Sequence, residues 1–137
     1  MGRFYCKKLR ERKSDGGFSI NLFAQFKEDK AMFFELREYR IKDGKRDRWV
    51  ELMEEKIIPF QVSKGMVCVG SFVALDEPDL YVWIRRFENE EEAERLYKAV
   101  YETEFWETEI KPLVDEMFDR DRKRVTRIEA TPKSVIR

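Results

Sequence analysis

The chain has 137 residues, of which 42% are hydrophobic and 41% are charged, with 28 basic and 28 acidic side chains. This length suits one domain, and the apolar fraction supplies a core, which excludes a wholly disordered chain. The chain contains no histidine, which excludes a histidine-ligated haem and every nucleophile activated by a histidine base.

The first 31 residues differ in charge from the remainder. Residues 1–31 carry 8 basic and 4 acidic side chains, whereas residues 32–137 carry 20 and 24. We therefore expect a flexible N-terminal extension at 1–31 and one folded domain at 32–137. A cytoplasmic location with reduced Cys6 and Cys68 is the main expectation. Mitochondrial targeting is the alternative, because transit segments are Arg-rich and acid-poor.

A strand and then a helix are predicted at the start of the folded part. Residues 33–41 are rich in β-formers and end before the turn signal Asp43-Gly44. Residues 45–63 then place apolar side chains at helical spacing, with Gly65 as terminator. Proline lacks an amide hydrogen, so Pro59 is expected to bend or shorten the last turn.

Two strands joined by a short turn follow. Residues 66–75, MVCVGSFVAL, are almost continuously apolar, which predicts a strand shielded on both faces. Residues 80–88, LYVWIRRFE, form the next strand, and the turn at 76–79 makes the pair antiparallel. Side chains alternate along this second strand. Leu80, Val82 and Ile84 lie on one side, and Tyr81, Trp83, Arg85 and Phe87 lie on the other.

Helical patterns and one further strand complete the chain. Asn89 and Glu92 form a capping-box-like helix start. Helical spacing continues to Met117, with a joint at Thr103 or Pro112, and the last strand is predicted at 122–131. The order β-α-β-β-α(α)-β predicts a ferredoxin-like α+β fold, a four-stranded antiparallel sheet with its helices on one face.

One face of this sheet is expected to meet a partner. If the helices cover the aliphatic side of the strand at 80–88, the aromatic side stays open. Its three aromatic rings together reach roughly 450–750 Å², more than a monomer usually exposes in one patch. A second copy, packed sheet against sheet, would cover them. An RNA that stacks its bases is disfavoured, because the RNP1 pattern is absent and residues 32–137 are net acidic.

Alternation on the first strand adds polar groups to the same side. The candidate ligand-binding residues of the resulting lumen are Glu35, Arg37, Tyr39, Trp83 and Arg85. Two interpretations stay open. Arginine offers a planar fork to a carboxylate or carbonyl and tyrosine a phenolic donor, which favours a ligand site. Alternatively, Glu35 and its arginine neighbours form a salt bridge that fixes strand pairing.

Several site classes receive no support. The chain lacks the nucleotide-binding glycine motifs and HExxH, so we expect no cofactor and no bound metal. The acidic turn at 76–79 is read as a solvated turn. No apolar run approaches the roughly 18 residues that a membrane span needs.

Five segments resemble the NIPSNAP family, which belongs to the dimeric α/β-barrel group. They are FELREYRIKDGK at 34–45, KIIPF at 56–60, VGSF at 69–72, YVWIRRFEN at 81–89 and FWETEIKPLV at 105–114. The resemblance covers about residues 33–131. It implies a homodimer whose two sheets face each other around a cavity. Family members are mostly of undefined biochemistry, and animal relatives are linked to mitochondria and to protein interactions.

Three functions follow as hypotheses. The first is a homodimeric barrel that binds a small metabolite in the lumen between the sheets. The second is a cofactor-independent oxygenase or isomerase, in which Arg37 or Arg85 steadies an oxyanion and Glu35 or Tyr39 moves a proton. The third is a protein-interaction module with a packed interface that holds no ligand.

Overall fold

The computed structural model describes residues 31–137. The expected N-terminal extension, Cys6 and the targeting hypothesis therefore lie outside the described residues, apart from residue 31. Within the described part, no helix combines the length and the apolar character needed to cross a membrane.

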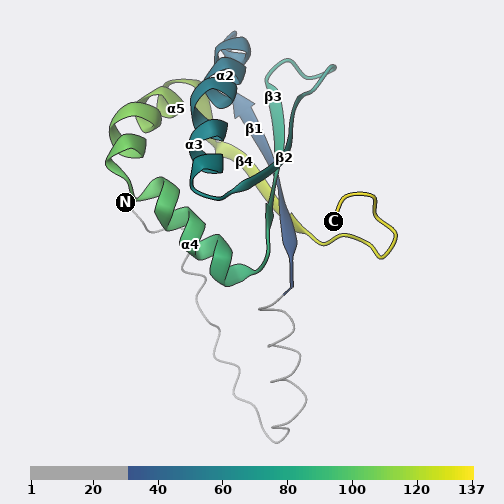
Figure 1. The fold of residues 1–137 in the computed structure, drawn as a ribbon. Helices are drawn as coiled ribbons and strands as arrows, with labels where there is room; N and C mark the ends of the chain where they lie inside the picture. Colours follow the sequence, from purple (N-terminus) through teal and green to yellow (C-terminus); the bar gives the residue numbers. More distant parts are fainter. Residues whose placement is uncertain (1–30) are drawn as a thin grey trace, which may run out of the picture.

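Four strands and three helical segments follow in the predicted order (Figure 1). The first half contains β1 (Phe33–Ile41), α2 (Arg46–Leu52), the π-helix η1 (Met53–Ile57), α3 (Ile58–Ser63) and β2 (Val67–Val73). The second half contains β3 (Leu80–Phe87), α4 (Glu90–Tyr101), the π-helix η2 (Trp106–Ile110), α5 (Lys111–Met117) and β4 (Phe118–Ile128). The order β-α-β-β-α(α)-β is confirmed.

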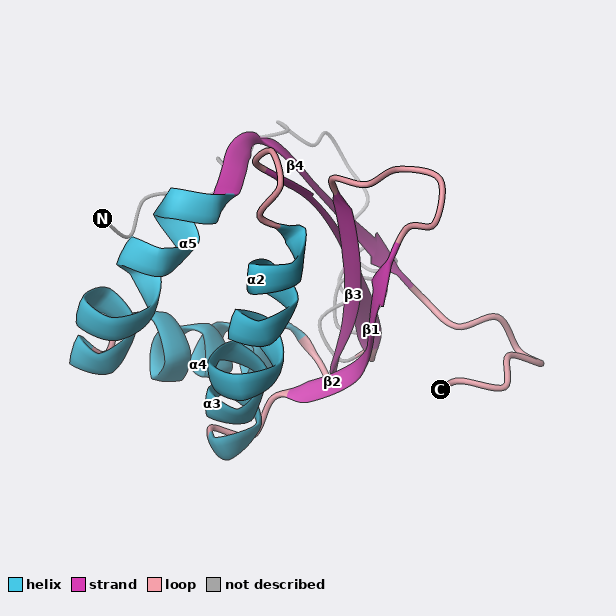
Figure 2. Ribbon diagram, turned by 90° about the horizontal axis from the view of Figure 1, so that it is seen from above, coloured by secondary structure: helices cyan, strands magenta, loops and turns pink. Residues whose placement is uncertain are grey.

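The strands form one antiparallel sheet in the order β2-β3-β1-β4. All helices lie on one face of this sheet, as Figure 2 shows from above. The ferredoxin-like α+β plan is therefore confirmed. Because β1 and β3 occupy the centre, side chains that face the helices from these two strands are the most enclosed in the domain.

The prediction for residues 66–75 is wrong in one respect. Their strand, β2, lies at the edge of the sheet and not in a doubly covered position. Val67, Phe72 and Val73 are 45%, 56% and 41% exposed. An apolar run therefore did not distinguish a strand covered on both faces from an edge strand covered on one.

The last strand begins earlier than predicted, at Phe118 and not at residue 122. Its pairing with β1 shifts register between Glu38 and Arg40. Exposed charged residues follow this irregular start, so no regular alternation of apolar and polar residues marks the beginning of the strand.

Both prolines expected to disturb helices follow a π-helical stretch. Pro59 comes directly after η1 and Ile58, and Pro112 directly after η2 and Lys111. A proline cannot bond to the carbonyl four residues before it, and a wider π turn is one way to accommodate this. The helix containing Pro59 continues to Ser63, so this proline does not shorten it.

Two polar side chains lie at the starts of the helical segments in the second half and accept backbone hydrogen bonds there. Asn89 Oδ1 accepts a 2.8 Å hydrogen bond from the Glu92 amide, which confirms the predicted cap of α4. Thr103 Oγ1 accepts a 3.2 Å hydrogen bond from the Trp106 amide just before η2. The joint between the two helices therefore lies at Thr103.

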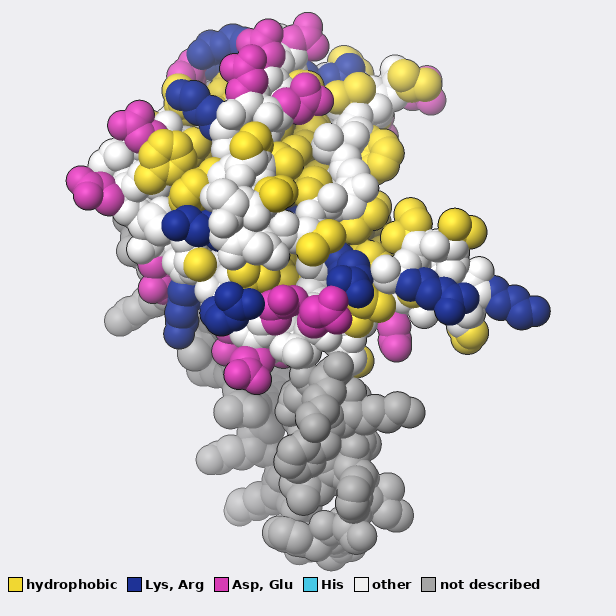
Figure 3. Space-filling view, viewed as in Figure 1, with side chains coloured by type: hydrophobic (Ala, Val, Ile, Leu, Met, Phe, Trp, Pro, Cys, Tyr) yellow, Lys and Arg dark blue, Asp and Glu magenta, His cyan; other side chains and the backbone are white. Residues whose placement is uncertain are grey.

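The hydrophobic core fills the layer between helices and sheet. Large buried side chains include Trp49, Met53 and Ile57 from the first helical segment and Ile110 from the third. Figure 3, viewed as in Figure 1, shows the surface that faces the reader, with hydrophobic side chains in its middle and charged side chains around its margin. The core therefore stabilises the helices directly above β1 and β3.

Candidate functional site

The structure reverses the predicted faces of β3. The side under the helices carries Tyr81, Trp83, Arg85 and Phe87, each at most 2% exposed. The outward side carries Leu80, Val82 and Ile84, which are half-buried. The prediction that the helices cover the aliphatic side is therefore wrong.

The five candidate residues lie together, but on the other side of the sheet. Opposed pairs across β1 and β3 are Glu35 with Arg85, Arg37 with Trp83, and Tyr39 with Tyr81. Directly opposed residues share one face of a sheet. The strand pairing thus groups the five as predicted, and all of them face the helices of their own chain. They do not line the open surface of the sheet.

Partners on the helices explain this burial of charge. Gln61 of α3, together with Tyr97 and Tyr101 of α4, reaches the charged groups of the sheet. Buried charges are tolerated when they are paired and hydrogen-bonded, and the aromatic rings bury more apolar area than aliphatic side chains. These groups form a buried charge cluster, made of Glu35, Arg37, Gln61, Arg85, Tyr97 and Tyr101.

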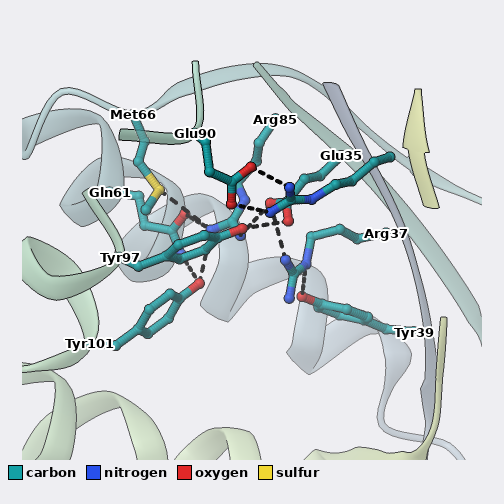
Figure 4. Close-up of polar contacts among 10 residues, drawn as sticks. Glu35, Arg37, Tyr39, Gln61, Met66, Arg85, Glu90, Tyr97 and Tyr101 are labelled. Atoms are coloured by element: carbon teal, nitrogen blue, oxygen red, sulfur yellow. Dashed lines mark hydrogen bonds and ion pairs between the residues drawn. The ribbon is translucent and has the colours of Figure 1, made fainter. Parts of the chain in front are cut away.

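Glu35 is the only carboxylate of the buried charge cluster (Figure 4). Its Oε1 accepts hydrogen bonds from Arg85 Nη2 at 2.8 Å and from Arg37 Nη1 at 3.1 Å. Its Oε2 accepts a hydrogen bond from the Tyr97 hydroxyl. The fully buried carboxylate is therefore neutralised and held from three directions.

Arg85 is the most connected group and is 0% exposed. Besides Glu35, its Nη1 donates to Gln61 Oε1 at 3.0 Å and to the Tyr101 hydroxyl at 2.8 Å. Its guanidinium carbon also lies 4.8 Å from the Trp83 ring centroid and 5.2 Å from that of Tyr97, within the range of a cation–π contact. Arg85 therefore connects β3 to β1, α3 and α4.

Arg37 marks the other end of the cluster. Its Nε donates to the Tyr39 hydroxyl at 2.7 Å and its Nη1 donates to Glu35. Figure 4 shows the remaining terminal nitrogen, Nη2, without a hydrogen bond. Arg37 as a whole is 5% exposed, and its Nη2 keeps some access to solvent, because the fully buried atoms that lack a partner do not include it.

The electrostatics favour fixed protonation states. Burial raises the pKa of Glu35, but Arg85, Arg37 and the Tyr97 hydrogen bond outweigh it and hold the pKa below its usual value. Burial raises the pKa of Tyr97 well above its usual value. Glu35 thus stays ionised and Tyr97 stays protonated near neutral pH. A carboxylate stabilised in this way is a weak general base, so the arrangement suits binding better than proton transfer.

Hydrogen-bond donors exceed acceptors in this layer. Two buried polar atoms near the cluster, Arg85 Nε and Trp83 Nε1, have no hydrogen-bond partner. Trp49 Nε1, in the adjoining aromatic core, is also unpartnered. Such groups are rare in native proteins and call for an explanation such as a bound molecule.

Sequence reasoning missed the partners contributed by the helices. Gln61, Tyr97 and Tyr101 are 26, 62 and 66 residues from Glu35 in the chain, so the alternation of a single strand does not reveal them. One available signal was the spacing of Tyr97 and Tyr101, which places both on the same face of α4. Another was the single uncharged polar residue, Gln61, on the buried side of α3.

Comparison with known proteins gives one family match. The NIPSNAP family model matches residues 34–131. No protein with a curated description matches the chain.

Several solved structures have a similar fold. One is a NIPSNAP family protein from Agrobacterium tumefaciens, at 21% identity and a TM-score of 0.69, covering 77% of this chain and 99% of that one. A second from the same organism, described as having unknown function, has 23% identity and a TM-score of 0.68, covering 79% and 96%. An uncharacterized NIPSNAP-like domain protein from Burkholderia xenovorans has 16% identity and a TM-score of 0.69, covering 77% and 90%.

Proposed function

This chain belongs to the NIPSNAP family, and we propose that it acts as a homodimer that binds a small molecule rich in hydrogen-bond acceptors. The proposed binding site lies in each protomer, between sheet and helices, beside the buried charge cluster. It replaces the lumen between two sheets that the sequence suggested, because Glu35, Arg37, Tyr39, Trp83 and Arg85 all face the helices.

The observation that carries the binding proposal is the excess of donors. One carboxylate, Glu35, serves two guanidinium groups, which leaves the cluster with a net positive charge. Arg85 Nε and Trp83 Nε1 are fully buried and remain without acceptors. A buried donor left unpaired costs about 1–3 kcal/mol. A ligand that offers carbonyl or carboxylate oxygens would supply the missing acceptors.

The outward face of the sheet supports the homodimer. Opposed pairs place Leu36 beside Ile84, and Phe72 beside Val82, on the side away from the helices. Phe72 is 56% exposed, and Val67 on the same side is 45% exposed. An antiparallel sheet that faces water on one side usually presents polar residues there. A second copy that presents the same apolar face would remove both from water.

Native mass spectrometry of the purified chain tests this proposal. We expect a particle of twice 16.7 kDa that carries a small-molecule adduct, and an Arg37→Lys variant that keeps the dimer mass but loses the adduct. Lysine keeps the charge next to Glu35 but not the planar fork.

The matched control is Arg95→Lys, at an exposed position of α4, which is expected to keep the adduct. A dimer without any adduct would contradict the binding proposal and favour an interaction module with a packed interior. An adduct retained by Arg37→Lys would contradict the proposed location of the site.

A further inference from the structure

Edge strand β2 contains one extra residue, Val69, which has no partner in β3. A β-bulge of this kind redirects the side chains that follow it. Val67 lies on the outward face of the sheet, and strict alternation from it would turn Phe72 toward the helices. The extra residue reverses this, so Phe72 lies beside Val82 on the outward face. A large aromatic ring is thereby directed away from the core and into water.

A glycine next to the bulge makes room for this ring. Gly70 also lies on the outward face, because it pairs with Ile84. Its backbone is not in the left-handed region, so its conformation does not require glycine. The carbon of a methyl group at this position would lie 2.8 and 2.9 Å from two atoms of the Phe72 ring. The ring therefore lies directly over the Gly70 backbone, and a side chain at position 70 would push it away.

This arrangement is unfavourable for an isolated protomer. Glycine loses more conformational freedom on folding than any other residue. Phe72 is 56% exposed, so much of an apolar ring stays in water. An aromatic ring packed over a strand glycine stabilises that glycine, but the contact covers only one face of the ring. The other face is free to pack against a partner.

A second copy of the chain fits this surface by area and by charge. Four strands about 4.8 Å apart and 8 residues of about 3.4 Å in β3 give the outward face roughly 500 Å². Two such faces together reach about 1,000 Å², the size that a specific interface needs. The charged residues of this face are paired within the chain, Glu38 with Arg124 and Arg86 with Glu88. Two identical faces therefore meet without strong repulsion, as a two-fold symmetric interface requires.

We propose that Phe72, positioned by the Val69 bulge and by Gly70, is an anchor residue of the interface between two copies of this chain. Its ring packs against the outward face of the partner sheet, where an aromatic side chain buries a large area. Gly70 is a positioning residue, because it acts by letting the ring lie flat on the sheet. This inference rests on the proposed homodimer and adds the residue that contributes most to its affinity.

Sedimentation velocity over a concentration series of the full chain tests the anchor. We expect Phe72→Ala to weaken the dimer about 100-fold or more, because an anchor contributes about tenfold or more in each copy and is lost twice in a symmetric pair. The matched control is Phe105→Ala, which removes a 43% exposed ring just before η2. This variant is expected to dimerise as tightly as the parent.

Gly70→Ala separates positioning from folding. The added methyl group displaces the Phe72 ring, so we expect the dimer to weaken by about tenfold. The protomer is expected to keep its circular dichroism spectrum and cooperative thermal unfolding, because alanine is at least as favourable as glycine in this backbone conformation.

The outcomes distinguish the anchor from the dimer itself. A dimeric parent whose Phe72→Ala and Gly70→Ala variants dimerise as tightly as the parent would overturn the anchor and leave the proposed homodimer in place. Equal weakening by Phe72→Ala and Phe105→Ala would also overturn the anchor. A parent that sediments as a single chain at every concentration would overturn the homodimer and the anchor together.

Discussion

An Arg85→Met variant is expected to lower the free energy of unfolding by about 3–5 kcal/mol, because removing one partner of a buried ion pair leaves the other without compensation. Glu35 would keep Arg37 and Tyr97 but lose its 2.8 Å contact with Arg85. Gln61 and Tyr101 would lose a donor as well. Chemical denaturation at one fixed protein concentration measures the change, since the stability of the proposed dimer would depend on concentration.

The matched control is Arg95→Met, which removes an arginine from an exposed position of α4. Its side chain is 66% exposed and its pair with Glu92 spans 3.8 Å. Exposed pairs of this kind contribute about 0–1 kcal/mol. Similar losses in the two variants would show that Arg85 is not a buried structural residue, which would contradict the geometry of the cluster.

A Glu35→Gln variant is expected to be less stable than the parent by on the order of 3 kcal/mol at neutral pH, because two buried arginines lose their carboxylate. The difference between the two proteins should depend on pH. The pKa of Glu35 in the folded state is lowered, so its stabilising effect is fully present above the unfolded value of about 4.3. It is lost as pH falls through the folded value.

Denaturation curves recorded between neutral and acidic pH therefore test the protonation state of Glu35. The gap between parent and Glu35→Gln should stay constant above about pH 5 and narrow below about pH 4. Glu91→Gln, at an exposed position in the first turn of α4, should show no comparable gap. A gap that widened on acidification would mean that Glu35 is protonated in the folded protein.

The fold could be predicted largely from local patterns. Neighbouring residues determine the strand at 33–41, the helix that follows it and the Asn89 cap. Each of these predictions was confirmed. The strand at 66–75 was correctly located but wrongly thought to be covered on both faces, because sheet order depends on long-range pairing.

The candidate residues were grouped correctly but assigned to the wrong face of the sheet. Both faces of the strand at 80–88 carry an arginine, Arg85 on one and Arg86 on the other, so charge did not discriminate between them. The decisive factor is whether distant side chains can satisfy a buried guanidinium. Gln61 and Tyr101 do so for Arg85, and no pattern within the strand carries that information.

Reversing the faces also changes how a dimer is expected to form. The residues left outward on β1 and β3 include the apolar Leu36, Val82 and Ile84 together with the charged Glu38 and Arg86. In the proposed dimer the two copies would therefore meet through this outward face, with each buried charge cluster enclosed in its own protomer. In the proposed function, binding and assembly would use opposite sides of the same sheet.

Sedimentation equilibrium of an Ile84→Asp variant tests this arrangement most directly. We expect the parent to sediment at twice 16.7 kDa and the variant at the mass of one chain with an unchanged circular dichroism spectrum, because a carboxylate would be buried at the interface. Leu75→Asp, at a 96% exposed position beyond β2, should stay dimeric. A parent that sediments as a single chain, or an Ile84→Asp variant that remains dimeric, would contradict the proposed meeting of two copies through the outward face of the sheet.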